Sequence, residues 1–353
     1  MSEASREKTD EIHAGYEFET GMFDRMRSWV DVAPWTRLFR VLRLLASPVY
    51  IVMVVMAVWV SMLLGNMLGV ELSALYAPMG LIRPEIVPRT VSAPLSMMSQ
   101  TSFSLSSLVG VIVCLGIWTP VIQVVARAGA SLTAARGLPP AGETLRLTWK
   151  RLLYSYAVPL LIIATIFFAL LGLYALQLPV VLFPHRIVGV TVGWLVGLAA
   201  VPVGVLIAGS MVAIPIGWAA MICEKDPDPI DSLSRGFEAL FRRPLQLVGY
   251  VVLAMLLVAL TQWFSSAALA AANFAWMHVP GAMTHAREFQ ISAIAATASV
   301  AVAWCLTLQF GLLGGIYLLL RRDTGGQEVE DFWQPDRMPQ APLPDLPEQA
   351  YSP

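Results

Sequence analysis

The chain has 353 residues, of which 57% are hydrophobic and only 13% carry a charge, and its mean hydropathy is +0.67. A soluble protein has about 45–50% apolar residues, so this composition is typical of a membrane protein. The formal net charge of −1 gives no basic surplus for binding nucleic acid, and no nucleic-acid partner is expected.

Residues 1–21 are polar, and we predict a disordered N-terminal tail there. They lack the apolar stretch of a cleaved signal peptide. We therefore expect the first apolar block to serve as an uncleaved membrane anchor.

Six long blocks contain no Asp, Glu, Lys or Arg. A helix needs about 20 apolar residues to cross a bilayer, so each block predicts one transmembrane helix. We predict an all-α polytopic membrane helix bundle whose six-span domain covers 22–322. The spans are expected at about 46–69, 104–127, 156–178, 187–222, 245–277 and 290–320.

The fourth block is long enough for two short helices. Two helices would place Arg235, Arg242 and Arg243 on the opposite side from the other basic loops. We therefore predict one long helix, kinked near Pro202 or Pro215.

Basic residues are distributed unevenly between the two predicted sides. All but four of the 23 Lys and Arg residues lie on the side of the two termini; the exceptions are Arg83, Arg89, Arg186 and Arg287. Lys and Arg accumulate in cytoplasmic loops. We therefore predict a multi-pass membrane protein with both termini in the cytoplasm.

Three segments, at 35–48, 143–159 and 231–244, precede the first, third and fifth spans and share one pattern. Each is amphipathic, carries basic residues and ends at a proline where an apolar block begins. We predict three interfacial helices on the cytoplasmic side, so that the chain repeats a unit of one such helix and one transmembrane hairpin. Their basic side chains are candidate contacts for anionic lipid headgroups or a partner protein: Arg37, Arg40, Arg43, Arg146, Lys150, Arg151, Arg235, Arg242 and Arg243.

An α-helical period assigns an apolar face to each of these segments. The residues on these faces are Trp35, Leu38, Phe39, Leu42 and Leu45 in the first; Leu145, Trp149, Leu152 and Tyr156 in the second; and Ile230, Leu233, Phe237, Leu240 and Phe241 in the third.

The third segment also carries charges of alternating sign. Asp231, Arg235, Glu238 and Arg242 follow each other at helical spacing, and we expect them to form a ladder that faces water. The alternative is a cation site that includes Glu224 and the aspartates after it. Prolines interrupt that cluster and no calcium-loop spacing follows, so the solvated face is favoured.

Small residues in the last spans predict close helix packing. We expect these small residues to pack helices of the same chain against each other; contact between two copies of the chain is the alternative. The glycines concerned are Gly189, Gly193, Gly197 and Gly204 in the fourth span and Gly311 and Gly315 in the sixth.

No motif for catalysis or cofactor binding is present: the sequence has no P-loop, HExxH, GxSxG or dinucleotide fingerprint. His185, His278 and His285 match no metal-site spacing. The predicted spans contain no charged residue of the kind that proton-coupled transporters and intramembrane proteases use. We therefore predict no catalytic, cofactor or metal site and no enzymatic activity.

Residues 323–353 are rich in proline and acidic residues, and we predict a disordered cytoplasmic tail. Docking of Trp333 or Tyr351 on the rest of the chain is the less favoured alternative.

The stretch DSLSRGFEALFRRPLQLVGY, at 231–250, resembles a pattern in a family of uncharacterised bacterial six-span inner-membrane proteins. The matching residues are Asp231, Leu233, Ser234, Arg235, Phe237, Arg243 and Pro244, while Ser232 stands where an alanine is usual. The stretch at 144–160 resembles the corresponding earlier segment. The resemblance extends over about 35–321 and implies a fold and a location, but no activity and no site residue.

Two functions remain open. The first is a non-enzymatic scaffold or subunit of a membrane complex, with membrane lipids, other membrane proteins or a second copy of the chain as partners. The second is a passive or lipid-handling transporter or channel that needs no charged coupling residue.

Overall fold

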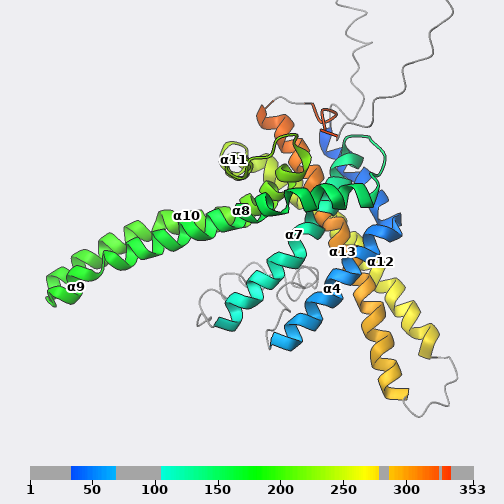
Figure 1. The fold of residues 1–353 in the computed structure, drawn as a ribbon, viewed down its shortest axis with the longest axis horizontal. Helices are drawn as coiled ribbons and strands as arrows, with labels where there is room; N and C mark the ends of the chain where they lie inside the picture. Colours follow the sequence, from blue (N-terminus) through cyan, green and yellow to red (C-terminus); the bar gives the residue numbers. More distant parts are fainter. Residues whose placement is uncertain (1–32, 69–104, 278–285, 326–327, 335–353) are drawn as a thin grey trace, which may run out of the picture.

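The computed structural model describes residues 33–68, 105–277, 286–325 and 328–334. Within these ranges all regular elements are helical (Figure 1). They are the 3-10 helix η1 (Pro34–Ala46) and the α-helices α4 (Pro48–Leu68), α7 (Leu105–Thr133), α8 (Ala141–Ala175), α9 (Leu178–Leu182), α10 (Arg186–Cys223), α11 (Pro229–Arg242), α12 (Pro244–Met277) and α13 (Ala286–Gly325). The predicted N-terminal tail, His278, His285 and Tyr351 lie outside the described residues.

The long helices form three hairpins that spread from one region (Figure 1). Helix α4 packs on α7, α8 on α10, and α12 on α13, and the most extensive interface joins α7 to α13. The α8–α10 hairpin projects away from the other four long helices and ends at α9. We call the region where η1, α11 and the adjoining ends of α7, α8, α10 and α13 meet the hub.

Five of the described helices are long and apolar enough to cross a membrane. They supply spans within Ile112–Thr133, Ala141–Leu182, Arg186–Cys223, Pro244–Ala272 and Ala296–Thr324. A sixth is reached only if η1 and α4, which are bent by 77° at their junction, count as one broken span. The chain is thus an all-helical multi-pass membrane protein with five or six candidate spans.

The long fourth block forms a single helix. Helix α10 continues from Arg186 to Cys223 with Pro202 and Pro215 inside it. A proline removes one backbone hydrogen bond, but membrane helices tolerate this where neighbouring groups compensate. One long helix, rather than two short ones, fills this block.

The prediction of three separate amphipathic helices is wrong for the second segment. Helix α8 runs without a break through Pro159, which is buried within it. By contrast, η1 ends before Ser47 and α11 before Arg243, and each is followed by a proline that begins a new helix. A proline disfavours helical backbone dihedral angles at the residue that precedes it. Ser47 is extended and Arg243 also leaves the helical region, whereas the residue before Pro159 stays helical.

The buried face of η1 differs from the predicted one because the segment winds as a 3-10 helix. Side chains three residues apart then share a face, and Leu38, Val41 and Leu44 are fully buried at that spacing. Trp35 and Phe39, from the predicted apolar face, are 45% and 43% exposed.

Small and hydroxyl residues, rather than the large apolar ones, face the interior in the other two segments. In α11 these are Ser232, Gly236 and Ala239. A Cβ added at Gly236 would lie 2.6 Å from the Cα of Ala213 in α10. Ile230, from the predicted apolar face, is 65% exposed. Small residues let two helices approach closely, while a large apolar side chain can face lipid without penalty.

The same pattern holds in the first half of α8. Thr144, Thr148 and Ser155 are buried, whereas Trp149 is 71% exposed. The hydroxyl groups are satisfied within the helix or by a neighbour; Thr148, for example, donates to the carbonyl of Thr144. In α11 and the first half of α8, small and hydroxyl side chains are therefore buried, while Ile230 and Trp149 remain outside.

The predicted packing glycines fall into two groups. Gly311 and Gly315 are in tight contact, since a Cβ at Gly311 would lie 2.7 Å from Leu44 and one at Gly315 would lie 2.6 Å from Thr133. A Cβ at Gly314, which the sequence did not single out, would overlap the Ala126 carbonyl of α7. The glycines of α10 behave differently, because a Cβ on any of them would meet nothing within 4 Å: Gly189, Gly193, Gly197 and Gly204.

Candidate functional site

The C-terminal end of α10 is capped by two arginines from neighbouring helices. Arg127 of α7, which is 3% exposed, donates to the carbonyl of Ile222 at 2.5 Å. Arg151 of α8 donates to the carbonyls of Met221, Glu224 and Lys225 at 2.6–3.0 Å. The carbonyls at the end of a helix lack intrahelical partners and carry partial negative charge. Two guanidinium groups therefore bind there, and neither has a carboxylate partner in the part of the chain that the structure describes.

A short segment beyond α13, residues 328–334, packs onto these arginines. Its Val329 and Phe332 are 1% and 4% exposed. The guanidinium of Arg151 lies 4.5 Å from the ring centroid of Trp333, and that of Arg127 lies 5.3 Å from it. Such stacking of a cation on an aromatic face is favourable. We call residues 328–334 the C-terminal strap.

The strap is also held by polar contacts to three other elements of the hub. Arg37 of η1 pairs with Glu330 at 2.5 Å, and Arg136 donates to the Glu330 carbonyl at 2.6 Å. Arg321 of α13 donates to the carbonyl of Asp331 at 2.9 Å. The prediction of a disordered tail from residue 323 is therefore wrong for the described part. Helix α13 continues to Gly325, and Phe332 and Trp333 supply the apolar and aromatic contacts that a disordered tail lacks.

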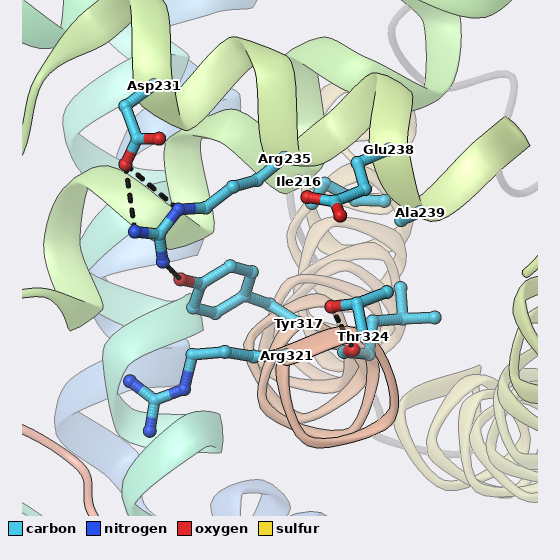
Figure 2. A pocket seen from close by; sticks show the side chains of 9 residues that line it. Ile216, Asp231, Arg235, Glu238, Ala239, Tyr317, Arg321 and Thr324 are labelled. Atoms are coloured by element: carbon cyan, nitrogen blue, oxygen red, sulfur yellow. Dashed lines mark hydrogen bonds and ion pairs between the residues drawn. The ribbon is translucent and has the colours of Figure 1, made fainter. Parts of the chain in front are cut away.

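Next to the strap, helices α11 and α13 enclose a pocket of about 250 Å³ (Figure 2). The α11 residues that line it recur at helical spacing, and so do those of α13, so one face of each helix forms a wall. Ile216 of α10 completes the lining. The other lining residues are Asp231, Arg235, Glu238 and Ala239 of α11 and Tyr317, Leu320, Arg321 and Thr324 of α13.

Arg235 connects the two walls. It binds Asp231 through its Nε and Nη2 atoms at 2.9 and 2.8 Å, and its Nη1 atom contacts Glu224 and the Tyr317 hydroxyl. The Tyr317 hydroxyl in turn donates to Glu224. Burial alone would lower the pKa of Arg235, but Tyr317, Glu224 and Asp231 outweigh burial and raise it further above its ordinary value. The guanidinium therefore stays charged and cross-links α11 to α13 and to the end of α10.

The expected charge ladder of α11 is thus only partly a solvated face. Arg242 is 70% exposed and pairs with Glu238 on the surface. Asp231, Arg235 and Glu238, however, line the pocket opposite α13. The acidic residues after Glu224 do not gather into a metal site: no group of three or more His, Cys, Asp or Glu with suitable geometry occurs in the described residues. His185 accepts a hydrogen bond from the Ile187 amide at the start of α10.

The nine candidate basic residues differ in their burial and contacts. Arg37, Arg151 and Arg235 make contacts within the chain, as described above. Arg40 is partly buried. The remaining five have exposed side chains around the hub: Arg43, Arg146, Lys150, Arg242 and Arg243.

Sequence reasoning missed several residues of the site. Arg127 was placed at the end of the second predicted span, because the charge-free block ends immediately before it, yet α7 continues to Thr133. Tyr317 and Arg321 were assigned to the end of the last span and its flank. One signal could have suggested a buried contact between a cation and an aromatic ring. A basic residue follows directly after a long apolar block, and an aromatic pair, Phe332 and Trp333, occurs elsewhere in the chain.

Fold and site together define an all-helical multi-pass membrane protein with a polar hub at one end of its helices. No family model, curated protein or solved structure matches the chain.

Proposed function

We propose that the chain is a non-enzymatic scaffold or subunit of a membrane complex. It would reside in the bacterial inner membrane with both termini in the cytoplasm. The observation that carries this proposal is the α8–α10 hairpin, whose apolar surface is covered by the rest of the described chain only near the hub. Only 17% and 11% of the apolar windows of these two stretches are buried.

The far half of the hairpin combines large and small exposed residues. Trp194 and Leu198 are 73% and 64% exposed. They line a shallow groove whose floor is formed by Gly189, Gly193 and Gly197. Lipid can cover such a surface, but small residues between large ones also permit close approach of another helix. Helices of another membrane protein, or of a second copy of the chain, would pack on this groove and cover the part of the hairpin that lies far from the hub.

The orientation is supported by the five exposed basic residues of the hub. Lys and Arg accumulate on the cytoplasmic side and interact with anionic headgroups there. A reporter enzyme fused after Arg322 should be active only in the cytoplasm. Activity in the periplasm would overturn this orientation.

Association can be tested with the intact chain, extracted from its native membrane in lipid-retaining polymer and analysed by mass spectrometry. The variant Gly193→Leu with Gly197→Leu fills the groove. Gly249→Leu in α12 is the matched control, since a Cβ there also meets nothing within 4 Å. We expect defined membrane proteins, or a defined oligomer, with wild type and control but not with the double variant. Recovery of a monomer with lipid alone from all three would contradict the scaffold proposal.

A second candidate, a lipid-handling transporter, is favoured by the pocket between α11 and α13. Its charged walls lie at the end of the candidate spans, where lipid headgroups are found. Flux or lipid exchange in liposomes that contain the purified chain would support this alternative over the scaffold.

A further inference from the structure

Both helices of the α8–α10 hairpin carry a proline at the level where the hairpin leaves the hub. Pro159 lies inside α8 and Pro215 inside α10. The two prolines flank one contact between these helices, since a Cβ added at Gly217 would lie 3.1 Å from Cγ1 of Val158. A proline removes one backbone hydrogen bond and is a usual place for a helix to bend. The hairpin can therefore bend at the same level in both of its helices.

The burial of the hairpin changes at this level too. In α8 the last buried residue is Ile162. In α10 only Val192 is buried before Gly209, and the other buried residues lie between Gly209 and the end of the helix. Among the described residues, the hairpin is thus packed on the hub at its base and is almost entirely uncovered beyond it. We call residues 163–208 the outer hairpin.

A hydrogen bond between the two helices holds the base together. Because Pro159 has no N–H group, the carbonyl of Ser155 lacks its usual helical donor. The Nε1 atom of Trp218 in α10 donates to this carbonyl at 3.1 Å. Neighbouring helices can satisfy a backbone group that a proline has freed in this way. The bond fixes α8 to α10 on the hub side of both prolines and leaves the outer hairpin unconstrained.

The directions of the hairpins give a reason for movement at the prolines. In Figure 1, α8–α10 points to the left of the view, whereas α12–α13 points downward. Both hairpins contain candidate spans, and transmembrane helices tilt by only about 20° on average from the bilayer normal. To cross one flat bilayer, at least one hairpin must turn relative to the hub. Helices α12 and α13 have no internal proline, whereas both helices of α8–α10 do.

We propose that Pro159 and Pro215 form a hinge about which the outer hairpin turns, from the spread arrangement seen here to one aligned with α12–α13. The Trp218–Ser155 bond is the latch that keeps the base on the hub during this movement. Because the outer hairpin carries the glycine groove, the hinge sets the direction in which that groove faces. The hinge follows from the alignment of the spans and not from a scaffold role, so failure of one proposal does not decide the other.

The test measures the distance between two spin labels in the full chain by pulsed electron paramagnetic resonance, with the three native cysteines replaced by alanine. The label sites are Gln177→Cys, next to α9 at the tip of the hairpin, and Trp263→Cys, at a 72% exposed position of α12. The part of α10 from Arg186 to Gly209 is roughly 35 Å long, so a turn of about 20° moves the tip by about 12 Å. We expect two populations in detergent micelles, separated by about that distance, and only the shorter in nanodiscs.

The variant Pro159→Ala with Pro215→Ala restores both backbone hydrogen bonds. It should give one population that does not shift between micelles and nanodiscs. Pro202→Ala is the matched control, because this proline lies in the same helix but within the outer hairpin, and it should behave as wild type. A single, unchanged distance for wild type would overturn the hinge, and so would a wild-type shift in the double variant. If the double variant does not fold, Pro215→Ala alone should narrow the distribution, and an unchanged distribution would contradict the hinge.

The latch is tested by a double-mutant cycle. Trp218→Phe removes the indole donor and should broaden the distance distribution when Pro159 is present. In the Pro159→Ala background the backbone N–H of residue 159 binds the Ser155 carbonyl, and Trp218→Phe should then have little effect. Equal broadening in both backgrounds would show that Trp218 acts through packing alone and would overturn its role as the latch.

Discussion

Helix pairs α7–α13 and α8–α10 are both long, apolar and rich in glycine, but they differ in what their glycines contact. The apolar windows of the α7 and α13 spans are 67% and 78% buried, against 17% and 11% for those that contain α8 and α10. In the first pair Gly314 and Gly129 lie against backbone of the facing helix. In the second pair the regularly spaced glycines of α10 face open space.

The difference shows that a pattern of small residues on one helix does not by itself determine whether that helix packs closely against another. Close packing requires small residues on both helices at the point of contact. Helix α7 supplies Gly129 and Ala126 opposite the glycines of α13. No described helix supplies them opposite Gly193 and Gly197. Gly193 and Gly197 of α10 therefore provide a surface, whereas the α13 glycines provide a core.

The largest expected effect comes from adding a side chain in the α7–α13 contact. Gly314→Leu should prevent the two helices from meeting, because even a Cβ would overlap the Ala126 carbonyl, and overpacking costs about 3 kcal/mol or more when backbone must move. We expect loss of the folded monomer by size-exclusion chromatography in detergent. Gly172→Leu on α8, where a Cβ would meet nothing within 4 Å, is the matched control and should elute as wild type. Equal damage from both variants would remove the distinction between the two pairs.

The next largest effect concerns the buried cation that links α7 to the end of α10. Arg127→Met keeps most of the side-chain volume but leaves the carbonyls of Ile222 and Trp333 without this donor. Losing charge-assisted bonds to buried carbonyls should destabilise the chain by about 2 kcal/mol, measured as a lower melting temperature of the purified protein. The exposed Arg146→Met is the control and should melt as wild type. A wild-type melting temperature for Arg127→Met would show that burying the charge costs as much as its contacts contribute.

Much of the fold follows from the sequence, and the charge-free blocks show why. Each block long enough to cross a bilayer contributes to a described helix. The limits of the 38-residue α10 were visible because Arg186 begins it and Glu224 follows it directly. Which face of a helix is buried was less predictable. In water the apolar face is buried, but in a membrane lipid accepts Ile230 or Trp149 as readily as a protein core does.

The candidate site could be predicted only in part, because it depends on contacts between distant segments. Local spacing grouped Asp231, Arg235 and Glu238 of α11 in one charge ladder, but it assigned that ladder to water rather than to a pocket. Tyr317, which accepts a hydrogen bond from Arg235, lies 82 residues beyond it, and nothing in the sequence around Tyr317 marks it. The strap was assigned to a tail from its composition, and its order depends on arginines from η1, α7 and α8 that no local pattern connects to Trp333.

A smaller effect is expected from the strap itself. Trp333→Ala removes the ring that stacks on Arg127 and Arg151, and two partly buried cation–aromatic contacts correspond to about 1–2 kcal/mol. The melting temperature should fall by a few degrees, and limited proteolysis should cleave the variant near residue 334 sooner than wild type. Trp194→Ala, which removes a 73% exposed ring from α10, is the control. Identical cleavage of wild type and Trp333→Ala would argue that the strap is held by Glu330 and Phe332 rather than by Trp333.

The smallest effect tests the α10 glycines without filling their groove. Gly193→Ala with Gly197→Ala should raise the stability of the isolated monomer slightly, because alanine favours a helix over glycine by about 0.5–1 kcal/mol per site and its methyl group meets nothing here. Gly315→Ala on α13 should do the opposite, since its Cβ would lie 2.6 Å from Thr133 Oγ1 and 2.8 Å from Leu38. Melting temperatures of the two variants in detergent give opposite signs if this account is correct. A decrease for both would mean that the α10 glycines pack against part of the same chain, and the surface proposed for a partner would then be an internal contact.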